Sequence, residues 1–180
     1  MIYSYNECIE KYNNLNQFRK ALNEGKLRKL EKGYYSDQKY EPEMAVIARK
    51  YPNAVLTLNS AFYYHGLTDT IPDFYYLSTD KDAYKIRDNR IVQLFDNSGQ
   101  FMLGAVMSEV EDAKILMYNK ERLLIEAVRN RSRLPFDYYK EIINNYREIV
   151  YELDIQAIEE YAELLPKTAL VKNTLRMEVL

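Results

Sequence analysis

The stretch KLRKLEKGYYSD, Lys26–Asp37, decides how the start of this chain is interpreted. It has strand-forming residues on both sides of Gly33, a composition typical of a tight β-hairpin. Gly25, just before it, stands where the glycine that follows a helix belongs. The stretch therefore predicts a helix that ends before Gly25 and a hairpin that follows it at once.

Two short helices are predicted upstream of this hairpin. Ser4 and Glu7 have the spacing of a capping box, which predicts that the first helix starts after Ser4. Asn14, with Gln17 three residues later, predicts the start of the second helix. The inward stripe of the second helix is expected to be Leu15, Phe18, Ala21 and Leu22. Its outward residues are expected to be Asn16, Gln17, Arg19, Lys20 and Asn23.

Helix, short turn, helix and hairpin is the order of a helix-turn-helix with a wing. A further helix usually precedes this pair, and only a few residues precede Ser4. The module is therefore either shortened or takes a packing partner from the rest of the chain. We predict a winged helix-turn-helix-like module over residues 1–40, lacking its first helix, and an α+β interaction domain over residues 41–180.

Charge is unevenly distributed along the chain, whose net charge is −2. Residues 1–40 hold 8 Lys and Arg against 5 Asp and Glu, a net of +3, and residues 41–180 hold 17 against 22, a net of −5. A small basic module joined to an acidic body is expected where only one end meets phosphate.

The candidate DNA-contacting residues lie on the second helix and on the hairpin. Arg and Lys side chains suit guanine edges and phosphates, whereas Asn and Gln suit adenine edges. The alternative is an ordinary solvated helix face beside a charged hairpin. The candidates are Asn16, Gln17, Arg19, Lys20, Arg28, Lys29 and Lys32.

The rest of the chain predicts a sheet followed by helices, which makes the fold class α+β. Pro42 and Pro52 frame a helix, and a short helix ends at His65. Segments with strand composition, separated by turn residues, favour an antiparallel or mixed sheet, and the later periodicity indicates a C-terminal helical bundle. These strands are expected at 73–80, 90–95, 101–110 and 113–118, and the helices after Asn119, from Phe136, after Asp154 and from Pro166 toward Leu180.

Several classes of protein and site are disfavoured. The single cysteine, Cys8, rules out an internal disulfide and a cysteine-based zinc site, and it is expected to be a small buried group. No apolar run is long enough for a membrane span, and the start does not resemble a signal peptide, so a cytoplasmic location is expected. No phosphate-binding glycine loop or nucleophile motif is present, so no cofactor is predicted.

His65, the only histidine, lies in the stretch NSAFYYHGLTDTIPD, Asn59–Asp73. Ser60 lies five residues earlier, so a helix would turn it away from the imidazole. A zinc site would need further nitrogen or sulfur ligands. His65 is therefore interpreted as the end of a helix, with its side chain near the last carbonyl groups and Gly66 reversing the chain.

Glu109, Glu111 and Asp112 cluster after a predicted strand, with Lys114 nearby. Nucleases hold magnesium with such carboxylates. Carboxylates at a tight turn are also common on solvated surfaces. A magnesium-dependent nuclease is therefore kept as an alternative function, and no metal site or catalytic residue is predicted.

Three motifs, in order, resemble the AbiEi-type antitoxin regulators. The hairpin region matches at Gly25, Leu27, Arg28 or Lys29, Leu30, Gly33 and Tyr35. The second motif, a Ser-Ala helix before His-Gly-Leu and a proline, matches at Ser60, Ala61, His65, Gly66, Leu67 and Pro72. The third is NKERLLIEAVR, Asn119–Arg129, which is similar to the helix that opens the C-terminal half of the family.

This resemblance implies a DNA-binding transcriptional autorepressor and antitoxin without enzymatic activity. Its winged helix would bind double-stranded DNA at repeats in its own promoter. Its second domain would counteract a nucleotidyltransferase-like toxin, in a type IV toxin–antitoxin system that acts in abortive infection and phage defence. His65 then becomes a landmark of the fold. A second alternative is a protein-interaction module that has lost DNA binding.

Overall fold

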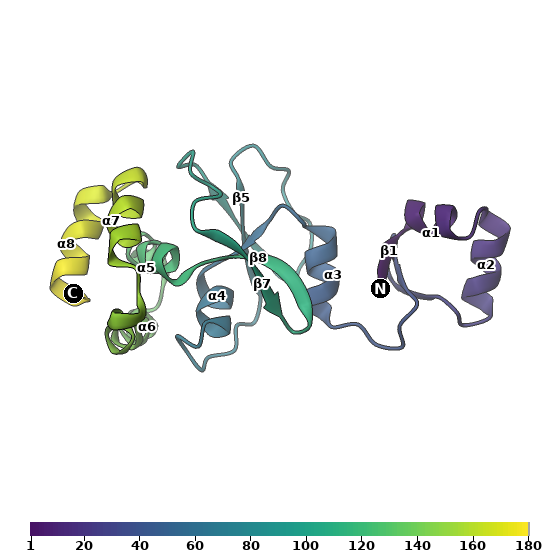
Figure 1. Ribbon diagram of the computed structural model, residues 1–180, viewed down its shortest axis with the longest axis horizontal. Helices are drawn as coiled ribbons and strands as arrows, with labels where there is room; N and C mark the ends of the chain where they lie inside the picture. The colour runs from purple at the N-terminus through teal and green to yellow at the C-terminus, as the bar shows by residue number, and fades with distance from the viewer. Residues whose placement is uncertain (180) are drawn as a thin grey trace. The chain divides into compact units, whose positions relative to one another are not determined.

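The computed structural model describes residues 1–179 (Figure 1), and the chain divides into two compact units. Unit 1 comprises Met1–Pro52 together with Glu109–Lys114, and unit 2 comprises Asn53–Ser108 together with the chain from Ile115 onward. Leu180, toward which the last helix was expected to run, lies outside the described residues. The α+β class expected from the sequence is confirmed.

Unit 1 combines three helices with a small antiparallel sheet. Its strands lie in the order β1-β3-β2, and the sheet includes the predicted hairpin. The strand β1 was missing from the prediction. The elements are β1 (Ile2–Ser4), α1 (Tyr5–Lys11), α2 (Leu15–Asn23), β2 (Arg28–Glu31), β3 (Tyr34–Ser36) and α3 (Glu43–Lys50).

Local signals in the sequence determine where α1 and α2 begin and end. The Ser4–Glu7 capping box is present in both directions, because each residue's side chain accepts a hydrogen bond from the other's backbone N–H. The Asn14 side chain accepts from the Gln17 backbone N–H at 2.9 Å and starts α2. Between the helices Asn13 takes the left-handed conformation, with φ 63°, and Gly25 does the same after α2, with φ 71°.

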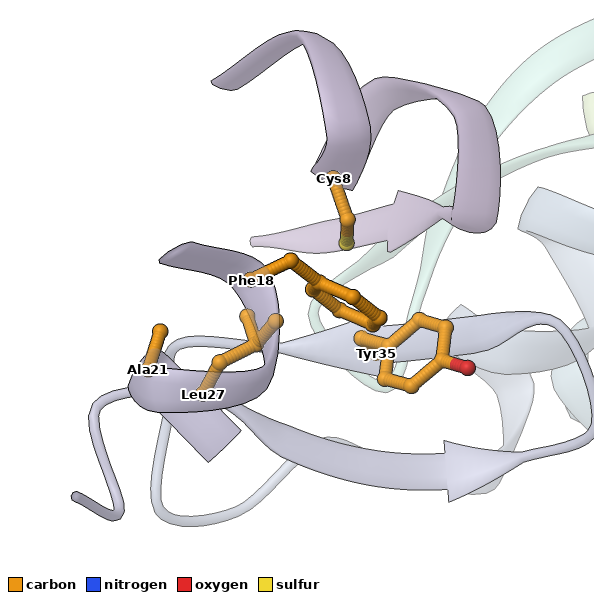
Figure 2. Close-up of a cluster of buried hydrophobic side chains, with 5 residues drawn as sticks. All are labelled: Cys8, Phe18, Ala21, Leu27 and Tyr35. Carbon is orange, nitrogen blue, oxygen red and sulfur yellow. The ribbon is translucent and has the colours of Figure 1, made fainter. Parts of the chain in front are cut away.

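A compact apolar cluster holds α1, α2 and the hairpin together. It consists of five buried residues that point toward one another, and the sulfur of Cys8 is fully buried among them, as the sequence predicted (Figure 2). The aromatic rings pack edge to face, the arrangement that their charge distribution favours. The cluster residues are Cys8, Phe18, Ala21, Leu27 and Tyr35.

The helix α3 belongs to unit 1, so this unit extends past residue 40, where the sequence placed the boundary. It contacts β1, and the Arg49 guanidinium donates to the Ile2 carbonyl and pairs with the Glu7 carboxylate. Met44 and Ile47 on the same helix are fully buried. The helix therefore provides β1 with a packing partner drawn from later in the chain.

Unit 2 is built on a five-stranded mixed sheet in the order β6-β5-β4-β8-β7, except that the end of β7 and the start of β8 belong to the segment Glu109–Lys114 of unit 1. The strand β4 runs antiparallel to β5 and parallel to β8, and β5 runs parallel to β6. Each long strand begins within four residues of its predicted start, and the mixed sheet is confirmed. The strands are β4 (Val55–Leu56), β5 (Tyr75–Asp80), β6 (Ile91–Asp96), β7 (Ala105–Val110) and β8 (Ala113–Tyr118).

The helices of unit 2 gather around α5, which contacts α4, α6, α7 and α8 (Figure 1). Its apolar residues from Leu123 to Val128 are fully buried, and its N-cap is Asn119, as predicted. In the part of the chain that the structure describes, every helix is too short or too polar to cross a membrane. The helices are α4 (Leu58–Tyr64), α5 (Lys120–Arg129), η1 (Arg131–Arg133), α6 (Phe136–Glu148), η2 (Val150–Glu152), α7 (Ile155–Leu164) and α8 (Thr168–Glu178).

Candidate nucleic-acid interface

The helix α2 presents one apolar face and one polar face. Phe18 and Ala21 are buried, whereas Asn16, Gln17, Arg19 and Lys20 are all exposed. The prediction for Leu15 was wrong, because its side chain is 38% exposed. Leu15 is the first residue of the helix, and side chains on a helix lean toward its N-terminus, so this one extends beyond the turns that face the cluster.

The hairpin carries the other three candidates. Arg28 and Lys29 lie on β2 and are exposed, and Lys32 is exposed in the turn next to Gly33. The β2–β3 register shifts between Lys29 and Glu31, which marks a bulge. The Tyr5 backbone N–H donates to the Gly33 carbonyl at 2.9 Å, so the turn is attached to the start of α1. All seven sequence-predicted residues thus reach solvent from two consecutive elements.

Several acidic groups of unit 1 are paired with cations outside these two elements. Glu7 pairs with Arg49, and Asp37 pairs with Lys11 at 3.0 Å. Hydrogen bonds from the Ser4 backbone and from Arg49 lower the pKa of Glu7 to about 2. These carboxylates therefore remain ionised at neutral pH, but their charge is compensated locally.

The exposed cations of α2 and of the hairpin have few acidic partners. Within residues 1–179, Arg19, Arg28, Lys29 and Lys32 form no ion pair. Lys20 shares the Glu24 carboxylate, at 3.8 Å, with Lys26, at 2.7 Å. Exposed cations without a partner keep their hydrogen-bond donors and their full charge available to an external anion such as a phosphate.

His65 lies at the end of α4, where it is the C-cap. Its Nε2 donates to the Tyr118 carbonyl on β8 at 2.9 Å, rather than reaching the last carbonyl groups of its own helix, as the sequence suggested. Burial lowers the pKa of His65, so the neutral ring is favoured. Gly66 follows with φ 69° and reverses the chain, as predicted.

The acidic cluster of the nuclease alternative surrounds the turn between β7 and β8. Glu111 and Asp112 form the turn itself, with φ of 49° and 61°, and they are exposed, as are Glu109 and Lys114. Among residues 1–179, no three His, Cys, Asp or Glu side chains are grouped so that they could hold a metal ion.

Sequence reasoning missed a polar region in unit 2. Arg129, Arg133 and Lys167 line a cavity there, although no role was predicted for them. The one local signal was Arg122 and Glu126, which are spaced four apart within the otherwise apolar stripe of α5 and are both buried. A charged pair on the buried face of a helix is unusual enough to mark a site.

The fold has a counterpart among solved structures. The chain is similar to the RV2827C protein from Mycobacterium tuberculosis in its crystal structure, with a TM-score of 0.61 and 15% sequence identity. The match covers 98% of this chain and 71% of that one. No protein-family model matches the chain, and no curated protein matches it at a significant level. At this identity the likeness concerns the fold alone.

Proposed function

We propose that this protein is a cytoplasmic, non-enzymatic DNA-binding autorepressor and the antitoxin of a type IV toxin–antitoxin system. The observation that supports DNA binding is the set of exposed cations on α2 and on the β2–β3 hairpin, four of which have no ion-pair partner within residues 1–179. An α-helix fits the major groove of DNA, and a basic hairpin beside it can contact the phosphate backbone.

The polar residues at the start of α2 add the means to read bases. Asn16 and Gln17 occupy its first turn, and Arg19 and Lys20 follow one turn later, all of them exposed. In helix-turn-helix proteins the N-terminal residues of the second helix contact the base edges. The neutral amides would then discriminate bases, while the cations supply most of the affinity.

A gel-shift assay on the protein's own upstream region tests this half of the proposal. We expect a shift at low salt that weakens steeply as salt is raised. The double variant Arg19→Ala with Lys20→Ala should lose it. The matched control is Lys85→Ala with Arg87→Ala, which removes one lysine and one arginine from an exposed loop of unit 2. No shift for the wild type, or equal loss in both double variants, would overturn the DNA claim.

The antitoxin half rests on the resemblance of three ordered motifs to the AbiEi-type regulators. The test is co-expression with a nucleotidyltransferase-like gene taken from beside this one. Growth arrest by that gene alone, relieved by this chain, is the expected result. Arrest that persists in the presence of soluble, folded chain would overturn it.

A further inference from the structure

Unit 2 contains a polar cavity of about 430 Å³. Its walls come from the end of β6 and the loop that follows, from the C-terminal half of α5, from η1, and from the connection between α7 and α8. Pockets for small molecules have volumes of roughly 300–1,000 Å³. The cavity therefore has room for a metabolite, and not only for a single ion or water molecule.

The negative charges of the carboxylates in the cavity wall are already balanced by arginines. Glu126 accepts from Arg122 at 2.9 Å and from Arg129 at 2.6 Å. Asp96 accepts from Arg122 at 2.7 Å and from the Ser98 backbone N–H at 2.6 Å. Burial opposes ionisation of Asp96, but the Ser98 hydrogen bonds and the Arg122 charge hold its pKa below the ordinary value. Two guanidinium groups thus balance two carboxylates.

Two further cations line the cavity beyond this balanced network. Within residues 1–179, no acidic side chain pairs with Arg133 or with Lys167. The Lys167 ammonium donates to the Arg129 carbonyl at 2.7 Å, which keeps it at the cavity without neutralising it. In the same wall the Nε atom of Arg129 is buried and has no hydrogen-bond partner among the residues that the structure describes. The cavity therefore carries an excess of about two positive charges, one from each of the two cations.

The remaining lining groups suit the uncharged part of a polar ligand. They supply hydroxyl and amide groups, which donate and accept hydrogen bonds, and the ring of Phe95, which is 42% exposed and offers an apolar surface. The polar lining residues include Asn97, Ser98, Asn130 and Ser132.

We propose that this cavity binds a small phosphorylated metabolite, such as a sugar phosphate or a nucleoside monophosphate, whose phosphate contacts Arg133 and Lys167. A phosphate monoester carries a charge of about −1.5 to −2 at neutral pH, which matches two cations better than a single carboxylate does. The guanidinium fork of Arg133 can hold two phosphate oxygens at once, and the Lys167 ammonium acts as a point charge.

The test is isothermal titration calorimetry on the full chain with glucose 6-phosphate and with AMP, and with glucose and adenosine as uncharged counterparts. We expect at least one phosphorylated probe to bind and its uncharged counterpart to fail. Which of the two phosphates binds more tightly identifies the body of the ligand. Inorganic phosphate measures the contribution of the anion alone.

Two arginines of η1 provide a matched pair of variants. Arg131 and Arg133 are both exposed. Of these two arginines, Arg133 lines the cavity and Arg131 is not among its lining residues within residues 1–179. Arg133→Gln should weaken binding about tenfold or more, the loss expected for a charged hydrogen bond, whereas Arg131→Gln should change it by less than about twofold. Lys167→Asn should weaken binding too, and asparagine tolerates the left-handed conformation of Lys167, with φ 69°.

Three results would overturn the proposal, each obtained with chains whose circular dichroism matches the wild type. The first is no binding of any phosphorylated probe at millimolar concentration. The second is equal weakening by Arg131→Gln and Arg133→Gln, which would reveal a general surface charge effect. The third is equal binding of the phosphates and of their uncharged counterparts.

Discussion

The ring of Phe18 on α2 meets the ring of Tyr35 on β3 edge to face, with centroids 5.0 Å apart and planes at 89°. Tyr5 on α1 also packs edge to face against Phe18, with centroids 5.7 Å apart and planes at 89°. Phe18 is therefore the side chain that joins both helices to the hairpin strand. The same helix presents Arg19 and Lys20 to solvent, so the orientation of its candidate DNA-contacting face depends on this buried ring.

Phe18→Ala should destabilise unit 1 by about 3–5 kcal/mol, because it removes buried area and leaves a cavity in a small core. Phe18→Leu should cost less, since it keeps most of the apolar volume. Urea denaturation followed by circular dichroism measures both. Phe136→Ala on α6 is the control, because Phe136 is 68% exposed. A cost for Phe18→Ala no larger than that of the control would contradict the role of this ring.

The hairpin cations should determine part of the salt dependence of DNA binding. Removing one cation that binds a phosphate reduces the magnitude of the slope of log K against log salt by about 0.9. Replacing Arg28, Lys29 and Lys32 with glutamine should therefore reduce that magnitude by up to about 2.7 in fluorescence anisotropy titrations. The pair Lys85→Gln and Arg87→Gln should leave it unchanged. An unaltered slope in the hairpin variant would mean that other residues bind the phosphates.

The helices of unit 1 could be predicted because their signals are local. A capping box, an asparagine N-cap and a glycine after the helix each act over three or four residues. The strand β1 could not be predicted in this way. Ile2, Tyr3 and Ser4 are strand residues only because they pair with Ser36, Tyr35 and Tyr34, about thirty positions or more away. Ser4 is also the N-cap of α1, and this capping signal gives no indication that the residue ends a strand.

The exposed face of α2 could be predicted from helical periodicity, because the spacing of the apolar residues identifies the buried face and the remaining residues must then face solvent. The cavity of unit 2 could not be predicted from the sequence, because its lining comes from segments between Thr57 and Lys167. Arg133 and Lys167 look like ordinary surface residues in the sequence. Only the fold shows that they lie at one cavity and lack acidic partners within the described residues.

Arg122→Met should destabilise unit 2 by about 3–5 kcal/mol, because it leaves the Asp96 carboxylate without the cation it pairs with and leaves Glu126 with Arg129 alone. Arg122 is fully buried and also donates to the Gln100 and Leu103 carbonyl groups, at 3.0 Å each. Thermal unfolding measures the loss.

Neutralising Asp96 should restore part of that stability. The double variant Arg122→Met, Asp96→Asn removes the carboxylate that has lost its cation, while Glu126 keeps its ion pair with Arg129, so it should unfold at a higher temperature than Arg122→Met alone. A double variant less stable than the single one would show that packing by Arg122, rather than charge, dominates at this position.

His65 should make the stability of unit 2 depend on pH. Burial is the main cause that lowers its pKa in the folded state; the hydrogen bond to the Tyr118 carbonyl opposes burial in part, and the smaller effects of Lys120 and Glu121 lower and raise the pKa respectively. Between the ordinary value near 6.5 and the lowered one, the unfolded chain binds a proton that the folded chain does not. Stability should therefore fall as the pH drops below about 6.5, and should not change through His65 above it.

His65→Gln should remove this dependence, because glutamine can donate to the Tyr118 carbonyl but does not titrate. The measurement is the free energy of unfolding of both chains between pH 7.5 and pH 5, where the wild type should lose at most about 1.4 kcal/mol per pH unit more than the variant. Glu7, whose pKa is also lowered, titrates at more acidic pH and is common to both chains, so it cancels. Parallel pH profiles for the two chains would show that His65 takes up its proton equally in the folded and unfolded states.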